Sequence, residues 1–471
     1  MDFTSLIYLL AFLPAVVAVY YVLPLRWRKA ALALVSIVFY LNVRPIFGAM
    51  LAWVIVASYL AVRYFMSTPR RNKWQMAAWL AFIFAPMAFF KFRESVFTLW
   101  LPNSPLALVR PFSLLLPIGL SCYTLQAVGY VIDVYRGTIK GERSFVTHSL
   151  FVSFFPTVLS GPIQRAGALM PQLRHEVGHW DYDLAVEGVK RIIWGLFLKM
   201  AVADRMAAYL NTVLGNAEQY NSLTMLVALT MLALQIYTDF AGYSHLAIGT
   251  GALLGVRMSE NFRRPLFAVG LKELWSRWHI SLSSWLRDYV YIPLGGNRCS
   301  RVRVCFNTIV TFIASGMWHG VLPSYVLWGV AHGIAVTFER FVPVNRLKRH
   351  LATHIVGSVV TVMMMGIIFA FFRTSLDEAL NILRTLVMGD KSGGLIFHDP
   401  SNSVPLFIVS WLAFACVLCR DLYDEYAAPR LQSWQRGRGV AQMVFYVGVV
   451  LLLLAVGILD QDTRSFIYMR F

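Results

Sequence analysis

The chain has 471 residues, of which 58% are apolar and only 14% are charged, whereas soluble domains contain roughly 45–50% apolar and about 25% charged residues. Its apolar residues come in long unbroken runs, which exclude a secreted disulfide scaffold, a disordered chain and a β-barrel of short alternating strands. The net charge is +18, but the basic clusters lie at the ends of apolar runs, as the positive-inside rule requires, so we expect no nucleic-acid partner.

Apolar stretches that could form helices follow one another along the chain. They fall at about 5–24, 28–42, 45–65, 75–90, 112–133, 146–162, 185–209, 222–255, 304–320, 323–342, 353–373, 404–422 and 440–459. Runs of about 20 apolar residues cross a hydrocarbon core of about 30 Å. We therefore predict an all-α polytopic membrane protein in a lipid bilayer, with about 11 transmembrane helices in a single domain over residues 1–471. The run 5–24 is predicted to be a retained first span with its N-terminus outside, because basic residues follow it instead of preceding it.

A sequence typical of zinc proteases lies between two predicted spans. Residues 175–179 read HEVGH, which matches the H-E-x-x-H pattern in which two histidines on one helical face bind zinc. Pro171 and Gly178 make a helix here unfavourable, so a solvated loop is the favoured interpretation and we expect no metal site. A membrane zinc protease stays the alternative.

The stretch 222–255 is too long for an ordinary span. It contains Asp239 and His245 together with Gly242, Gly249 and Gly251, so we expect a break in the helix or a steep tilt. Placing an ionisable side chain within a membrane-spanning segment costs free energy, so each such residue is a candidate for a functional role.

The region 256–303 alternates aromatic residues with charge. Between Arg263 and Arg303 there are eight basic and two acidic residues. Two interpretations are open: an amphipathic surface helix with snorkelling arginines, or a re-entrant segment whose polar backbone is buried in protein or lines a cavity.

Two histidines lie in the consecutive apolar runs 304–320 and 323–342. His319 ends the first run and His332 lies inside the second, with Pro323 marking the start of the second helix of a hairpin. The glycines that would let the two backbones pack closely are Gly316, Gly320, Gly329 and Gly333. A neutral imidazole here could accept the proton of a hydroxyl or thiol, or it could serve only as a hydrogen-bonding group between helices.

Several blocks carry a resemblance to a known family. The blocks are PIGLSCYTLQAVGYVIDVYRG, FFPTVLSGPIQR, IYTDFAGYSHLAIG, ENFRRPL, WSRWHISLSSWLRDYVYIPLGGNR, GMWHG and WGVAHG. Together they resemble the membrane-bound O-acyltransferases, in particular the branch with alginate O-acetyltransferase and the D-alanyl transfer protein of teichoic acid synthesis. Two positions depart from the family pattern: His245 stands where an aspartate is usual, and Cys122 where an aromatic is usual.

The resemblance implies a fold and a set of site residues. The fold is a ring of helices, with re-entrant or interfacial helices, around a central funnel in a bacterial cytoplasmic (inner) membrane. His319 falls on the family's catalytic histidine, and His279 is the second catalytic candidate. The expected supporting residues are His332, Asp239, Ser281 and Trp318.

The implied reaction is acyl transfer, most simply of acetyl from acetyl-CoA to an exported polysaccharide. No tightly bound cofactor is expected. CoA phosphates pair well with arginine forks, and the candidates for this role are Arg263, Arg264, Arg277 and Arg287. The alternative function is a transporter or flippase-like protein that carries an acylated intermediate without chemistry.

The expected partner is an extracytoplasmic acetyltransferase or a polysaccharide-export complex. Loops as short as 387–402 are unlikely to build the groove that a polymer needs. We therefore expect a second protein to accept the acyl group at the outer face, with direct transfer to the polymer as the alternative.

Overall fold

The computed structural model describes residues 3–42, 44–68, 72–95, 117–174, 180–342, 344–397, 400–427, 444–451 and 453, which form helices joined by turns and irregular segments. Within these ranges no strand occurs, which agrees with the predicted all-α class. The chain divides into two compact units. The prediction of a single domain over 1–471 stays a prediction.

Unit 1 comprises Met1–Ile192 and Ser244–Glu260, together with the chain end from Tyr468, which lies outside the described residues. Its helices are α1 (Leu13–Val22), α2 (Leu25–Leu41), α3 (Gly48–Ser67), α4 (Lys73–Ser95), α6 (Leu120–Arg136), α7 (Phe145–Ser153), α8 (Phe155–Val158), α9 (Ala166–Arg174) and most of α10 (Tyr182–Leu196). The predicted stretch 146–162 is interrupted at Phe154, because Pro156 cannot continue the preceding helix. The HEVGH residues His175, Glu176 and His179 lie outside the described residues.

Unit 2 comprises Ile193–Tyr243 and Asn261–Ile467. Its helices are α11 (Asp204–Gly215), most of α12 (Ser222–Leu253), α13 (Leu271–Arg277), α14 (Ile280–Leu286), α15 (Arg301–His319), α16 (Pro323–Phe338), α17 (Leu351–Arg373), α18 (Leu376–Met388) and α19 (Pro400–Leu422). A π-helical stretch, Phe197–Ala203, joins α10 to α11.

Five of the described helices are long and apolar enough to cross a membrane. They lie within Pro45–Ser67, Lys73–Phe92, Ser222–Leu253, Leu351–Arg373 and Val404–Tyr426. The chain is therefore a multi-pass membrane protein, and the count of about 11 spans stays a prediction.

Helix α12 is continuous from Ser222 to Leu253, so the predicted break in it is wrong. Its glycines serve packing instead: a Cβ on Gly242 would lie 2.8 Å from the carbonyl oxygen of Gly195. A helix of 32 residues is about 48 Å long, so a steep tilt stays the expectation.

The region 256–303 is not one amphipathic surface helix. It forms two short helices, α13 and α14, that meet at His279, and a π-helical turn follows at Arg287–Tyr291. Its aromatic face is buried within the protein, with Trp278 and Trp285 only 2% and 6% exposed. This burial favours the re-entrant interpretation, because irregular backbone at membrane depth needs protein around it.

Candidate active site

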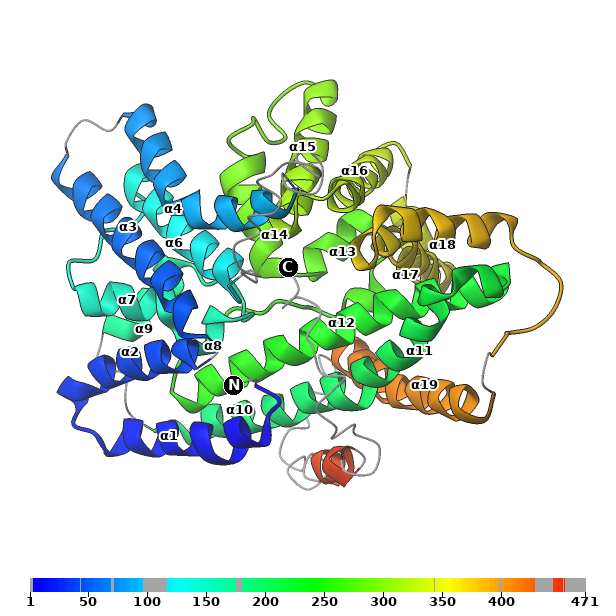
Figure 1. Ribbon diagram of the computed structural model, residues 1–471, viewed down its shortest axis with the longest axis horizontal. Helices are drawn as coiled ribbons and strands as arrows, with labels where there is room; N and C mark the ends of the chain where they lie inside the picture. Colours follow the sequence, from blue (N-terminus) through cyan, green and yellow to red (C-terminus); the bar gives the residue numbers. More distant parts are fainter. Residues whose placement is uncertain are drawn as a thin grey trace, which may run out of the picture. The chain divides into compact units, whose positions relative to one another are not determined.

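Helices α15 and α16 form a hairpin in which the two backbones touch (Figure 1). Pro323 is the first residue of α16, as predicted. A Cβ on Gly316 would lie 2.2 Å from the carbonyl oxygen of Tyr325, and one on Gly329 would lie 2.5 Å from that of Phe312. Only glycine permits these approaches, so the hairpin holds its side chains at fixed positions.

His319 is the last residue of α15 and is 4% exposed. Its ring packs edge-on against three aromatic rings, with centroid distances of 4.6 Å to Trp318, 4.8 Å to Phe372 and 5.5 Å to Trp328. This shell fixes the imidazole and keeps bulk water away from it. A base in such an environment acts without competition from solvent.

His279 lies in a strained turn between α13 and α14. Its φ is +41°, in the left-handed region that residues other than glycine rarely adopt. The turn is held by Asn261, whose carbonyl oxygen accepts from the Ile280 N–H at 2.9 Å and whose side-chain oxygen accepts from the Ser281 hydroxyl at 2.6 Å. Strain of this kind persists only where surrounding contacts enforce it, and it is typical of functional sites.

The Trp318 ring links the two catalytic candidates, since its centroid lies 6.0 Å from that of His279 and 4.6 Å from that of His319. His279 also packs on Phe240 of α12, at 4.6 Å between centroids. The structure therefore brings together His279, Trp318 and His319 in unit 2, and Ser281 joins them through Asn261.

His332 lies in the same aromatic cluster and is fully buried. Its Nδ1 accepts a hydrogen bond from the indole N–H of Trp275 at 3.4 Å. The ring of Trp328 packs on His332 at 4.8 Å and on His319 at 5.5 Å. His332 is thus placed to support the site through Trp328, and Trp275 is a site residue that the sequence did not single out.

Asp239 takes part in a buried ion cluster. Lys199 lies 2.9 Å from Asp239 and 2.5 Å from Asp204, and all three side chains are at most 3% exposed. The two carboxylates thus share the one buried ammonium group of Lys199, and this attraction offsets part of the free energy that burying the charges costs. The structure therefore places the Asp239 carboxylate against Lys199, while the adjacent Phe240 contacts His279.

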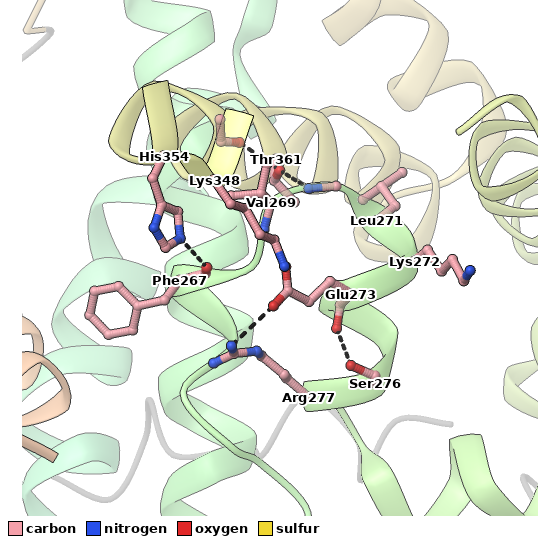
Figure 2. Close-up of polar contacts among 12 residues, drawn as sticks. Phe267, Val269, Leu271, Lys272, Glu273, Ser276, Arg277, Lys348, His354 and Thr361 are labelled. Carbon is pink, nitrogen blue, oxygen red and sulfur yellow. Dashed lines mark hydrogen bonds and ion pairs between the residues drawn. The ribbon is translucent and has the colours of Figure 1, made fainter. Parts of the chain in front are cut away.

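Two of the four predicted donor-binding arginines are held by one glutamate. Glu425 binds Arg264 at 2.8 Å and Arg277 at 3.0 Å. Arg277 also binds Glu273 of its own helix, which in turn binds Lys348 at 2.6 Å (Figure 2). These pairs anchor α13, the helix that leads into the His279 turn.

The other two arginines are exposed. Arg263 has an exposed side chain, and Arg287 forms a pair with its neighbour Asp288 at 2.8 Å with 62% of its side chain exposed. Their guanidinium groups face solvent, where an anionic ligand can reach them.

A cavity of about 330 Å³ opens beside the aromatic cluster. Residues of α13, α14 and α15 line it, and its lining includes Lys272, Trp275, Arg287, Phe312, Ser315 and Arg340. Ser315 lies one helical turn before His319 on α15, and Trp275 and Phe312 both pack on His332. Lys272, Ser315 and Arg340 could not be identified as site residues from the sequence, because they lie in separate segments that come together around one cavity only in the fold.

Among the described residues, no group of three or more His, Cys, Asp or Glu side chains is arranged to hold a metal ion.

The chain is similar to known membrane acyltransferases. A family model described as MBOAT, membrane-bound O-acyltransferase family, matches residues 140–375. A probable alginate O-acetylase of Pseudomonas aeruginosa is 36% identical over 74% of this chain and 68% of the relative. A peptidoglycan O-acetyltransferase of Helicobacter pylori is 29% identical over 82% and 79% of the two chains. A teichoic acid D-alanyltransferase of Bacillus subtilis is 28% identical over 49% and 60%. These matches confirm the resemblance inferred from the sequence.

Proposed function

This chain belongs to the membrane-bound O-acyltransferase family and is an O-acyltransferase, and we propose that it moves an acetyl group from acetyl-CoA to the outer face for O-acetylation of an exported polysaccharide. Relatives named for acetylation of alginate and of peptidoglycan support an acetyl group and a glycan acceptor. The observation that carries the proposal is the position of His319, at the end of α15, inside an aromatic shell shared with His279 and His332.

In the proposed step His319 is the general base. It removes the proton of the acceptor hydroxyl as that oxygen attacks the thioester carbonyl carbon, which forms a C–O bond and a tetrahedral oxyanion. Collapse of this intermediate breaks the C–S bond, and the imidazolium returns the proton to the departing thiolate. The products are the acetyl ester and free CoA thiol.

Donor groups for the oxyanion come from the strained turn. The hydroxyl of Ser281 lies beside His279 and donates to the side-chain oxygen of Asn261, and the Ile280 N–H donates to the backbone oxygen of Asn261. The Ser281 hydroxyl must therefore turn from Asn261 to donate to the developing oxyanion, whose charge it then stabilises. We assign this role to His279 and Ser281, with Trp318 and His332 as supporting residues.

We further propose that the protein lies in a bacterial inner membrane, with about 11 spans around a central funnel that admits the donor from the cytosol. An extracytoplasmic acetyltransferase or a polysaccharide-export complex accepts the acyl group at the outer face. The described loops offer no large soluble domain that could bind a polymer by itself.

The purified protein, reconstituted in lipid nanodiscs with acetyl-labelled CoA and candidate glycans, tests the reaction. We expect free CoA thiol to appear in proportion to labelled ester on the acceptor or on an added partner protein. Movement of an intact acylated molecule across proteoliposomes, without thiol release, would instead establish the transporter alternative.

A further inference from the structure

Helices α16 and α17 and the short helical turn Val344–Arg349 enclose an apolar groove of about 420 Å³. Phe338, at the end of α16, lines one side of it, and Val356, Val360 and Met364 of α17 line the other. We call it the α16–α17 groove. None of the catalytic candidates lines it, so its ligand has a role apart from the chemical step.

The groove opens on a face of the protein that meets the hydrocarbon of the membrane. Helix α17 is long and apolar enough to cross a bilayer. Val356, Val360 and Met364 recur at every fourth position and therefore share one face of the helix, where they are 62%, 46% and 38% exposed. Phe338 on the opposite wall is 65% exposed. Because a polar ligand would lose its hydration in this position without gaining hydrogen bonds, the groove suits an apolar chain.

The one charged side chain among the described residues that line the groove is already paired. Glu339 accepts hydrogen bonds from the backbone N–H groups of Leu271 and Lys272, the latter at 2.9 Å. The Thr361 hydroxyl, also in the wall, accepts from the Gly270 N–H at 2.8 Å. These bonds occupy the polar groups of the wall and join it to the start of α13. The groove therefore presents mainly hydrocarbon to its ligand.

A basic segment adjoins one end of the groove. The turn Val344–Arg349 contributes Val344 and Leu347 to the lining and carries Arg346 between them. The Thr353 hydroxyl donates to the Leu347 carbonyl oxygen at 2.6 Å, which fixes this turn against the start of α17. The Arg346 side chain is exposed, so an anion at this end of the groove can reach its guanidinium.

The start of α17 adds to the positive potential at this end. The helix begins at Leu351 with no side-chain cap on its first N–H groups, and such groups favour an anion together with the helix dipole. No acidic residue occurs in the sequence between Glu339 and Asp377. Basic segments beside a span lie on the cytosolic side by the positive-inside rule. This end therefore suits a phosphate group of the cytosolic leaflet.

The length of the groove is close to the depth of one leaflet. Its α17 wall runs from Ala352 to Met364, which is about 18 Å along the helix axis. One leaflet contributes half of a hydrocarbon core of about 30 Å. An acyl chain whose phosphate lies at Arg346 would thus extend along the whole groove within its own leaflet.

We propose that the α16–α17 groove binds one anionic phospholipid of the cytosolic leaflet, with an acyl chain along α17 and the phosphate at Arg346 and the first turn of that helix. This site goes beyond the proposed function and does not depend on it. Glu339 and Thr361 connect the wall of the groove to Leu271 and Gly270. A bound chain therefore also stabilises the start of α13, the helix that carries Trp275.

Photo-crosslinking tests the site without any acyl transfer. The probe is phosphatidylglycerol with a diazirine at the end of one acyl chain, added to the full chain in detergent, and peptide mass spectrometry maps the crosslinked residues. We expect crosslinks around Val360 and Met364. Unlabelled phosphatidylglycerol should displace the probe at a concentration about 5-fold lower than phosphatidylcholine, because one basic residue near an anionic lipid contributes about this factor.

Two pairs of variants locate the ligand. Val360→Trp fills the groove, and its control is Val359→Trp, which is exposed on the same helix but lies outside the lining. Arg346→Gln removes the cation, and its control is Arg301→Gln, an exposed arginine at the start of α15 that does not line the groove. We expect Val360→Trp to lose the crosslink and Arg346→Gln to lose the preference for the anionic lipid, while both controls match the wild type. Phosphatidylglycerol should raise the melting temperature of the wild type and leave that of Val360→Trp unchanged.

Three outcomes would overturn the lipid site: crosslinks on other helices with none in the groove, equal displacement of the probe by both lipids, or equal effects of a variant and its control. A dimer in native mass spectrometry, with a second copy of the chain covering the groove in place of lipid, would overturn it as well. If Val360→Trp fails to fold, Arg346→Gln still decides the preference for the anionic lipid, because its side chain lies on the exposed surface.

Discussion

The indole N–H of Trp275 donates a hydrogen bond to Nδ1 of His332 at 3.4 Å. A ring nitrogen that accepts cannot carry a proton, so the neutral His332 is protonated at Nε2. His332 is otherwise enclosed by aromatic rings, including that of Trp328, which also packs on His319. Trp275 therefore acts as a positioning residue, which sets the orientation of one histidine and, through Trp328, of the other.

Loss of this hydrogen bond should slow the reaction without weakening donor binding. In Trp275→Phe the ring stays but the donor is lost, and we expect kcat to fall about 3- to 10-fold, the effect of one neutral hydrogen bond. The matched control is Trp411→Phe on α19, since the Trp411 indole nitrogen has no hydrogen-bond partner among the described residues and its ring packs on Phe407 and Phe414. Steady-state kinetics across pH should show a changed profile for Trp275→Phe and the wild-type profile for the control. Equal losses in both variants would contradict the positioning role.

His319 is expected to be required for chemistry and dispensable for folding. Removal of one general base lowers the rate by roughly 10²- to 10⁴-fold, so His319→Gln should lose nearly all ester formation. The exposed His350 provides the control His350→Gln. Gel filtration and thermal unfolding should show both variants as folded as the wild type. Wild-type turnover by well-folded His319→Gln would remove His319 from the catalytic role.

The close packing of the α15–α16 hairpin predicts a large effect for a very small substitution. In Gly316→Ala the added Cβ would lie 2.2 Å from the Tyr325 carbonyl oxygen, which is backbone and cannot move aside. Overpacking of this kind costs roughly 1–3 kcal/mol, and it should displace His319, three residues away. Gly394→Ala is the control, because a Cβ there meets nothing within 4 Å. Thermal unfolding and activity should both fall for Gly316→Ala only; tolerance of this change would show that the hairpin is loosely packed.

Local features of the sequence predicted the hairpin well, whereas contacts between segments far apart in the sequence could not be predicted. Pro323 and the small residues around it predict a tight helical pair, because their effect is on the backbone nearby. The contact between the Asp239 carboxylate and Lys199, which lies 40 residues away in the sequence, could not be predicted from spacing. Ser315 and Arg340 gain their significance only from a cavity whose walls come from three helices. Spacing along a chain reveals which residues share a helical face, but it does not reveal what that face will meet.

The anchoring of α13 predicts a pH-dependent stability that can be measured at Glu273. This carboxylate, 20% exposed, accepts hydrogen bonds from Lys348 at 2.6 Å and from the Val269 N–H at 2.9 Å, and it lies 3.0 Å from Arg277 (Figure 2). Burial alone would raise the pKa of Glu273, but the bonds from Lys348 and Val269 and the charge of Arg277 outweigh it and lower the pKa below its ordinary value of 4.5. Because the pKa of Glu273 is lower in the folded than in the unfolded protein, its ionised form stabilises the fold. This contribution is fully present above pH 4.5 and is lost as the pH falls through the lowered folded pKa.

Glu273→Gln should therefore lower the melting temperature at pH 7, with a loss of about 1 kcal/mol after allowance for solvent screening. The difference from the wild type should shrink as the pH falls below the ordinary carboxyl value, because the wild-type side chain then becomes neutral as well. Glu187→Gln is the control: its carboxylate is 49% exposed and pairs with Arg191 at i,i+4 on α10, so its removal should change stability by only a few tenths of a kcal/mol. Thermal unfolding in detergent from pH 7 downwards measures all three proteins. A Glu273→Gln deficit that stays constant over this range would show that the side chain acts through packing and not through its charge.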